Sequence, residues 1–177
     1  GIGGAGMSVV AELLASRGAT VEGSDREDSA VLEHLRSVGV SVFVGHEASH
    51  VDPASVVVVS TAIREDNPEL AIARTRGQLV IHRSQALALA ATGMRFVGVA
   101  GAHGKTSTSG MLAIALAACG LDPSVAVGGV LPQLGTGAHL GGGDVFVAEA
   151  DESDGSFLNY SPAIEIVTNV EPDHLDR

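Results

Sequence analysis

The sequence predicts an α/β fold in which helices cover mainly parallel sheets. Short apolar runs rich in Val and Ile alternate with segments of helical apolar spacing, the order expected of right-handed βαβ units. Apolar residues make up 45% of the 177 residues, yet only four Phe and one Tyr are present. Such a composition suits β-branched strands that pack against helices rich in Ala and Leu.

The expected elements follow from apolar periodicity and from the residues that begin and end each segment. Residues 7–15 have the apolar spacing of a helix that packs on a sheet, and Gly18 suits its end. Residues 56–59 are consecutive valines, as expected of a strand covered on both faces. Pro68 suits the first turn of another helix. In chain order the expected helices cover residues 7–15, 29–38, 68–76, 84–91 and 105–119, and the expected strands cover residues 19–23, 41–44, 56–59, 79–81, 96–100, 144–148 and 164–168.

Charge and hydropathy exclude two classes of partner. The net charge of −11 leaves no basic patch that could follow a phosphate backbone, so a nucleic-acid partner is not expected. The sequence has no signal peptide and no apolar run near the length of about 18 residues that suggests a membrane span. We therefore expect no membrane insertion and a cytoplasmic location.

Lys105 is the only lysine in the chain, and it closes a glycine-rich turn between an expected strand and an expected helix. Residues 101–106 read Gly-Ala-His-Gly-Lys-Thr, which resembles a P-loop, although Val99 stands where the full pattern has its first glycine. Backbone N–H groups of such a turn can cradle phosphate oxygens, and the Thr106 hydroxyl can ligate Mg²⁺. The sequence therefore predicts a nucleoside triphosphate site, against the alternative of a chance surface lysine.

Polar clusters follow two later strands. Residues 149–154 read Glu-Ala-Asp-Glu-Ser-Asp, and a carboxylate there can hold magnesium at the phosphates, although a solvated acidic turn is the alternative. Residues 168–176 contain His174, and a lone His in a polar loop is more often structural or merely exposed. Because both clusters follow strands of a parallel sheet, they could meet the phosphate loop at one edge, which favours a ligand role for His174.

The first residues form a second glycine-rich loop. Gly1-x-Gly3-x-x-Gly6, with Asp25 after the next expected strand, matches the dinucleotide fingerprint. Glycines there let a diphosphate approach the helix N-terminus, and a nearby acid can accept from a ribose or a base. NAD and a UDP-sugar would use such a site in similar ways, so the loop alone leaves both open.

Two domains are expected, with a hinge at residues 92–95. Residues 1–93 are expected to form a Rossmann-like parallel-sheet domain whose first strand precedes the first glycine loop. Residues 94–177 are expected to form the first part of a P-loop-type α/β domain that binds ATP. Residues 128–143 contain seven glycines and one proline, so we expect a loop there. The chain has no initiator Met and stops just after a polar motif, so we expect a fragment of a longer protein.

The three ATP-side motifs, in this order, resemble those of the Mur ligase family. They are Gly-Ala-His-Gly-Lys-Thr, Glu-Ala-Asp-Glu-Ser-Asp and Thr-Asn-Val-Glu-Pro-Asp-His-Leu-Asp, and the resemblance spans essentially the whole chain. The first glycine loop and residues 60–63 most resemble the members that join L-alanine to UDP-N-acetylmuramate. Members that recycle murein peptides are the nearest alternative.

This resemblance implies a three-domain ligase whose domains bind the UDP-sugar, ATP with Mg²⁺, and the amino acid. The lactyl carboxylate would attack the γ-phosphate of ATP, and the amine of L-alanine would then displace phosphate from the acyl phosphate. Because the third domain lies outside these residues, we expect the 177 residues alone to form no amide bond.

The resemblance also implies site residues, each assigned to the position of this sequence that matches the family motif. The ATP loop would comprise Gly101, Ala102, His103, Gly104, Lys105, Thr106 and Ser107, the last standing where the family usually has Thr. The UDP-sugar site would comprise Gly1, Gly3, Gly4, Gly6, Asp25, Ser60 and Thr61. Thr106 and Glu149 would ligate one Mg²⁺ and His174 a second, and the catalytic residues would be Lys105, Glu149 and His174.

Two other classes stay open from the residues themselves. An NAD-linked oxidoreductase could use the first glycine loop, but it leaves the Lys105 motif unexplained. A non-catalytic UDP-sugar-binding protein that has lost its third domain would also fit, because the sequence does not show how the natural chain continues.

Overall fold

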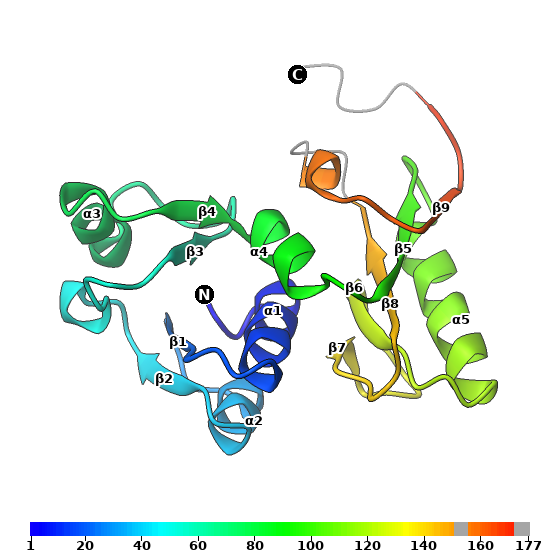
Figure 1. Ribbon diagram of the computed structural model, residues 1–177, viewed down its shortest axis with the longest axis horizontal. Helices are drawn as coiled ribbons and strands as arrows, with labels where there is room; N and C mark the ends of the chain where they lie inside the picture. Colours follow the sequence, from blue (N-terminus) through cyan, green and yellow to red (C-terminus); the bar gives the residue numbers. More distant parts are fainter. Residues whose placement is uncertain (151–155, 172–177) are drawn as a thin grey trace. The chain divides into compact units, whose positions relative to one another are not determined.

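The computed structural model describes residues 1–150 and 156–171 and confirms the predicted α/β class (Figure 1). The chain divides into two compact units, residues 1–86 and residues 87–177, called here the first unit and the second unit. In the described ranges, the structure contains no helix with the length and apolar character that a membrane crossing requires.

The first unit contains parallel strand pairs flanked by helices. β1 pairs in parallel with β2, and β3 pairs in parallel with β4. In chain order its elements are α1 (Ala5–Ser16), β1 (Glu22–Asp25), α2 (Ala30–Ser37), β2 (Ser41–Val44), the short 3-10 helix η1 (Ala48–His50), β3 (Val57–Val59), α3 (Pro68–Thr75) and β4 (Val80–His82). α4 (Arg83–Ala90) spans the division between the two units.

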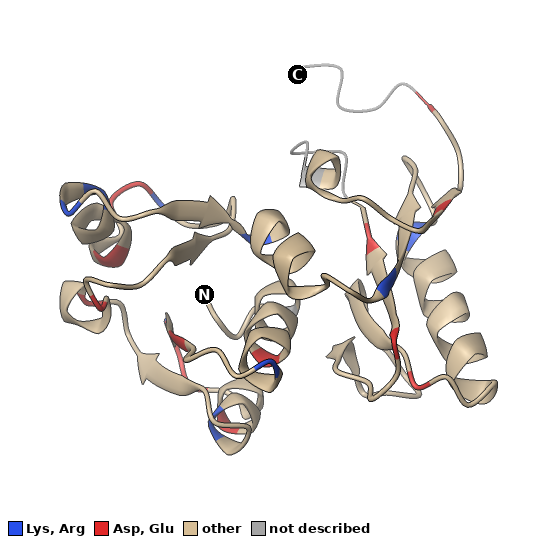
Figure 2. Ribbon diagram, viewed as in Figure 1, with Lys and Arg blue, Asp and Glu red and all other residues tan. Residues whose placement is uncertain are grey.

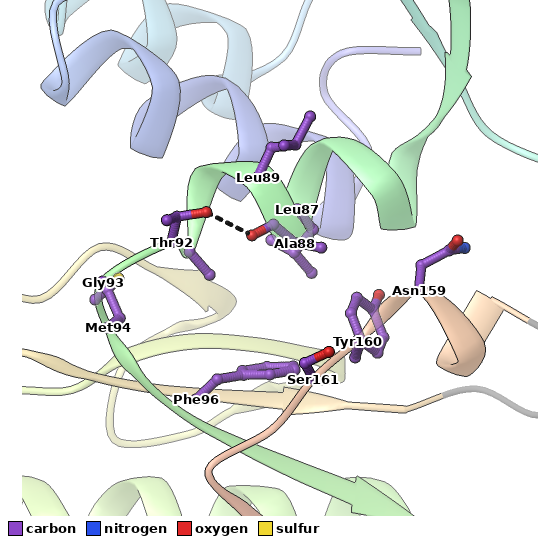
Figure 3. Close-up of a pocket in the computed structure, with 11 residues that line it drawn as sticks. Leu87, Ala88, Leu89, Thr92, Gly93, Met94, Phe96, Asn159, Tyr160 and Ser161 are labelled. Atoms are coloured by element: carbon purple, nitrogen blue, oxygen red, sulfur yellow. Dashed lines mark hydrogen bonds between the residues drawn. The ribbon is translucent and has the colours of Figure 1, made fainter.

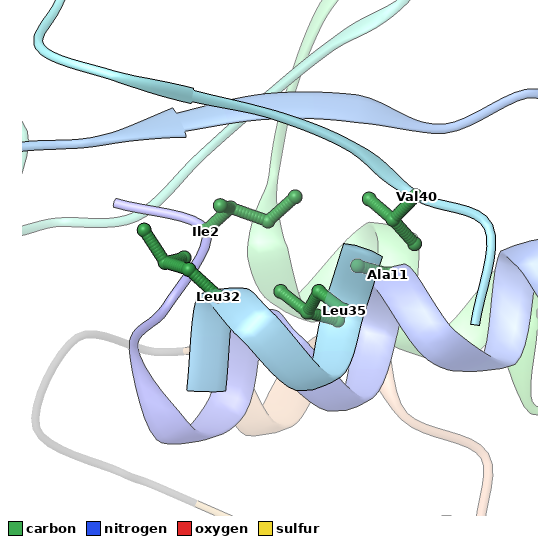
Figure 4. Packing of buried hydrophobic residues seen from close by; sticks show 5 residues of the cluster. All are labelled: Ile2, Ala11, Leu32, Leu35 and Val40. Atoms are coloured by element: carbon green, nitrogen blue, oxygen red, sulfur yellow. The ribbon is translucent and has the colours of Figure 1, made fainter. Parts of the chain in front are cut away.

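A small apolar cluster holds α1 and α2 against the first strand pair. Ile2, Ala11, Leu32, Leu35 and Val40 are buried together, and Figure 4 shows their side chains between the two helices and the strands. Complete burial of an aliphatic side chain contributes about 1.5–3 kcal/mol, so the two leucines of α2 account for much of its attachment. The spacing of these leucines, three residues apart, places both on one helix face.

Local capping sets the starts of two helices. The Ser29 hydroxyl accepts a hydrogen bond from the Leu32 N–H at 3.3 Å, which caps α2. The Asn67 carboxamide oxygen accepts from the N–H groups of Glu69 and Leu70 at 2.9 and 3.1 Å, which caps α3. The following Pro68 occupies the first helical position, as the sequence predicted.

The prediction that residues 56–59 are covered on both faces is wrong. Val57–Val59 form β3, but all three are only half-buried, and Val56 is 51% exposed. β3 belongs to a two-stranded sheet, so it has a strand neighbour on only one side. Four consecutive valines therefore reflect strand propensity here more than burial.

The second unit is built on a five-stranded sheet in the order β7-β6-β8-β5-β9. All neighbouring pairs are parallel except β6 and β7. Its elements are β5 (Arg95–Ala100), α5 (Lys105–Ala118), β6 (Ser124–Leu131), β7 (Thr136–His139), β8 (Val145–Glu149), the 3-10 helix η2 (Ser156–Asn159) and β9 (Ile164–Val167). Figure 1 shows α5 along one face of this sheet, where Leu112, Ala113 and Leu116 pack on strand valines.

The prediction of a loop over residues 128–143 is wrong in part, because residues 128–131 belong to β6 and residues 136–139 form β7, which pairs antiparallel with β6. The glycines permit this pairing. A Cβ added to Gly137 would lie 2.6 Å from the carbonyl oxygen of Val127, closer than real side chains come. Glycine in a strand often marks such a close backbone approach, and glycine content alone does not distinguish it from a loop.

Candidate functional site

The turn between β5 and α5 has the backbone of a phosphate-binding loop. Gly101 has φ 130° and Gly104 has φ 82°, values that side chains disfavour. Gly104 is the N-cap of α5, so Lys105 and the next two residues form the first helical turn. The N–H groups at a helix N-terminus have no intrahelical partner and suit an anion.

Lys105 folds back over this loop. Its ammonium Nζ donates to the carbonyl oxygen of Gly101 at 2.7 Å, and the side chain is half-buried. The other loop residues differ in exposure: Ala102 is half-buried, and His103, Thr106 and Ser107 are exposed. The predicted ATP residues are therefore contiguous, and the lone ammonium lies beside the backbone that would hold phosphate.

Two residues after β9 hold the loop from the side. β5 pairs with β9 so that Ala100 lies opposite Val167, and this register brings Thr168 and Asn169 beside the loop. The Asn169 carboxamide accepts from the His103 N–H at 3.0 Å and donates to the His103 carbonyl oxygen at 2.9 Å. Neither residue was predicted as part of the site, because their only signal in the sequence was a place in a polar cluster after a strand.

Two of the three predicted metal ligands, Glu149 and Thr106, lie beside the consecutive glycines Gly128 and Gly129 of β6. The carboxylate of Glu149, the last residue of β8, accepts from the Gly128 N–H at 2.7 Å. A Cβ on Gly129 would lie 2.9 Å from the Thr106 methyl carbon, so Thr106 adjoins the next residue of the same strand. A carboxylate and a hydroxyl are the hard oxygen donors that Mg²⁺ prefers.

The third predicted ligand, His174, lies outside the described residues, as do residues 151–154 of the acidic cluster. Within the ranges that the structure covers, no group of three or more His, Cys, Asp or Glu side chains is placed to hold a metal ion. The metal assignment therefore depends on Thr106 and Glu149 and remains a prediction.

In the first unit, Asp25 shapes the first glycine loop. The Gly3 N–H donates to Asp25 Oδ2 at 2.8 Å, and the other carboxylate oxygen accepts from the Arg26 N–H at 2.7 Å. A Cβ on Gly3 would lie 3.0 Å from Oδ2 and 3.1 Å from Leu32 Cδ2. Both oxygens of Asp25 are thus engaged by backbone, and a side chain at Gly3 would crowd the carboxylate.

Arg83 is a functional candidate that the sequence analysis missed. Its guanidinium covers the position that a side chain at Gly6 would occupy, with Cζ 3.0 Å from an added Cβ. A planar guanidinium beside a glycine loop suits a diphosphate. As one arginine among nine, Arg83 had no distinguishing signal in the sequence.

The remaining predicted sugar-site residues lie in separate places. Gly1 and Gly4 belong to the first loop, where the Gly4 N–H donates to the Gly1 carbonyl oxygen at 3.2 Å. Ser60 and Thr61 follow β3 directly, with Ser60 half-buried and Thr61 exposed. Among the hydrogen bonds of the described residues, the loop is joined to Asp25 and not to Ser60 or Thr61.

A polar network lies at the ends of β1 and β2. The Ser24 hydroxyl donates to the Glu69 carboxylate at 2.6 Å, and His46 Nδ1 lies 2.8 Å from that hydroxyl. His50 Nδ1 lies 3.2 Å from the second Glu69 oxygen, and its ring stacks on Phe43 at 4.3 Å. This network ties the strand ends to α3, and Ser24 precedes Asp25 directly.

The second unit also has a pocket, of about 290 Å³, at the opposite end of β5 from the phosphate loop (Figure 3). Phe96 and Tyr160 line it with their rings edge to face, 5.2 Å apart. Phe96 and Gly101 are separated by roughly 16 Å of strand. The pocket therefore lies away from every predicted ATP residue.

Basic side chains are sparse around both sites. Figure 2 shows the Lys and Arg residues of the described ranges dispersed over separate elements of each unit. Lys105 lies at the phosphate loop, and Arg83 lies at the first glycine loop. Local positive charge is thus available for small phosphate ligands.

Comparison with known proteins agrees with the motifs. The family model described as the catalytic domain of the Mur ligase family matches residues 1–95. The UDP-N-acetylmuramate–L-alanine ligase of Renibacterium salmoninarum is 58% identical over 177 residues, which are 100% of this chain and 38% of that protein. The ligase of that name from Streptomyces griseus is 58% identical over 175 residues, covering 98% and 38%. The chain thus spans about two fifths of the length of these relatives.

Solved structures of ligases also superpose on this chain. A murein peptide ligase from Psychrobacter arcticus superposes with a TM-score of 0.83 at 30% identity, covering 99% of this chain and 43% of that one. A UDP-N-acetylmuramate–alanine ligase from Thermotoga maritima superposes with a TM-score of 0.81 at 34% identity, covering 99% and 41%. Both share the fold of the present chain over nearly its whole length.

Proposed function

Because this chain belongs to the Mur ligase family, we propose that the full-length protein joins L-alanine to the lactyl carboxylate of UDP-N-acetylmuramate at the expense of ATP. This amide bond would serve peptidoglycan precursor synthesis. The observation that carries the proposal is the glycine loop with Lys105 and Thr106, next to Glu149 on the neighbouring strand. An NAD-linked oxidoreductase has no use for that loop.

The ATP phosphates are proposed to lie on residues 101–107. Their charge would be met by the N-terminal N–H groups of α5 and by the Lys105 ammonium, which would exchange the Gly101 carbonyl for a phosphate oxygen. Thr106 and Glu149 would hold one Mg²⁺, and His174 is proposed for a second. When bound, the metal would neutralise charge that develops on the transferred phosphoryl group.

The UDP-sugar is proposed to bind in the first unit. Its diphosphate would approach the first glycine loop at the N-terminus of α1, with Arg83 as the counter-charge. Asp25 supports this arrangement by holding the Gly3 N–H, and the carry-over from the family also assigns Ser60 and Thr61 to this site. The same loop could accept NAD, so the choice rests on family membership.

The reaction that these parts serve is carboxylate activation. A lactyl carboxylate oxygen forms a bond to the γ-phosphorus as the bond to the ADP oxygen breaks, and the amine of L-alanine then displaces phosphate from the acyl carbon. The residues described here contribute positioning and charge neutralisation, the two largest resources for phosphoryl transfer. ATP and UDP-sugars are cytoplasmic metabolites, so the proposed location is the cytoplasm.

Release of phosphate by the full-length enzyme tests the proposal. We expect release to require ATP, UDP-N-acetylmuramate and L-alanine together. Dependence on a murein peptide instead of L-alanine would assign the protein to the recycling ligases, the second candidate, whose structures share this fold. Binding of NAD(H) in preference to the UDP-sugar would overturn the assignment of the first unit.

A further inference from the structure

The Asn169 side chain makes two hydrogen bonds to the phosphate loop, one with the N–H and one with the carbonyl oxygen of His103. Its carboxamide oxygen accepts from the His103 N–H at 3.0 Å, and its amide nitrogen donates to the His103 carbonyl oxygen at 2.9 Å. The neighbouring Thr168 hydroxyl lies 2.6 Å from the same carbonyl oxygen. These contacts join residues more than sixty positions apart, so the β5–β9 pairing is what creates them.

The same two residues also fit sterically against Gly101. A Cβ on Gly101 would collide with the Thr168 hydroxyl and would lie 3.0 Å from the backbone nitrogen and oxygen of Asn169. The positive φ of Gly101 adds to this requirement. Glycine at this position is therefore required by the segment after β9, in addition to any requirement from phosphate.

The contacts determine which loop amides can meet an anion. The His103 N–H is directed at Asn169, so it is turned away from a phosphate. The amides from Gly104 onward, at the N-terminus of α5, have no partner within the helix and can meet phosphate. Because His103 directly precedes Gly104, fixing both backbone groups of His103 fixes the orientation of these amides.

We propose that Thr168 and Asn169 are positioning residues that hold the phosphate loop in its ATP-binding conformation. This inference rests on the proposed ATP site and adds residues to it. An ordered loop has less conformational entropy to lose when ATP binds, so the contacts should act mainly on ATP affinity. Both side chains are half-buried and lie outside the apolar clusters. The Thr168 N–H bond to the Ala100 carbonyl oxygen survives substitution, whereas the hydroxyl bond to the same oxygen at 3.2 Å does not.

The full-length enzyme carrying Asn169→Ala is the first test. We expect the KM for ATP to rise about tenfold, because two hydrogen bonds of modest net worth are lost, with little change in the KM for UDP-N-acetylmuramate or in Tm. Thr168→Val removes the hydroxyl at constant shape and should act in the same direction, and Thr168→Ser should restore ATP affinity. Val170→Ala is the matched control, because Val170 is the next residue and is 89% exposed.

Hydrogen exchange of the peptide over residues 101–106 gives a readout that does not need ATP. Exchange should accelerate in Asn169→Ala and Thr168→Val and should be unchanged in Val170→Ala. If wild-type enzyme fails to use ATP, the proposed function fails while exchange still decides whether the contacts order the loop. Unchanged exchange and unchanged ATP affinity in both variants would overturn the inference. Equal rises in the KM values of all substrates, with a lower Tm, would also overturn it by showing a purely structural role.

Discussion

Replacement of Glu149 by Gln and by Ala separates its two possible roles. Gln keeps an oxygen that can accept from the Gly128 N–H, whereas Ala removes that acceptor, and both substitutions remove the charge. Gly128 is exposed, so water can replace the lost acceptor. We therefore expect Glu149→Ala to cost about 1 kcal/mol of stability or less, and Glu149→Gln to cost a smaller amount.

The effect on metal dependence should be much larger and common to both variants. Loss of a carboxylate ligand should raise the Mg²⁺ concentration needed for half-maximal rate by at least about tenfold, since even outer-shell partners of metals have effects of 10–100-fold. Phosphate release by the full-length enzyme, measured across a magnesium titration, gives this value, and urea unfolding gives the stability. If Glu149→Gln kept the wild-type magnesium dependence, the carboxylate would act through Gly128 and the metal role would be wrong.

The other predictions address the phosphate loop, the first glycine loop and an ion pair. Lys105→Ala should abolish most ATP turnover in a phosphate-release assay with an unchanged circular dichroism spectrum; full activity with unchanged ATP affinity would refute the P-loop interpretation. Gly6→Ala should raise the KM for UDP-N-acetylmuramate and leave that for ATP unchanged, because the new methyl group displaces the Arg83 guanidinium; a selective rise for ATP would contradict the site assignment. The hydrogen-bonded Arg95 guanidinium lowers the pKa of Asp144, so this pair stabilises the second unit above the usual carboxyl pKa and its contribution is lost as pH falls through the lowered value. Asp144→Asn should therefore flatten the acid limb of the stability curve, and an unaltered limb would show that the pair contributes nothing.

The start and stop of most elements could be predicted from the sequence because the interactions that set them are local. Asn67 and Pro68 cap α3, and the glycine before Lys105 begins α5, within a few residues of the helices they define. The glycine turn between β5 and α5 was predictable for the same reason, since a strand, a glycine turn and a lysine are consecutive in the chain.

Long-range pairing decided the features that the sequence analysis missed. β7 and the second half of β6 were predicted as a loop, because glycine content does not reveal that a partner backbone lies within 2.6 Å of the Cβ position of Gly137. The partial exposure of the β3 valines depended on how the two-stranded sheet of β3 and β4 is packed. Neither fact is encoded in the spacing of neighbouring residues.

The sequence by itself determined the α/β class, the glycine turn between β5 and α5 and the family, because each depends on residue types at short, fixed spacings. Only the tertiary structure decided that Asn169 binds His103, that Arg83 covers Gly6, and that Thr106 and Glu149 adjoin consecutive glycines of β6. The physical reason is that these contacts join segments far apart in the chain, which become neighbours only when the strands and helices pack. For Glu149, which ends β8, strand register also matters, because a shift of one residue would turn its side chain to the opposite face.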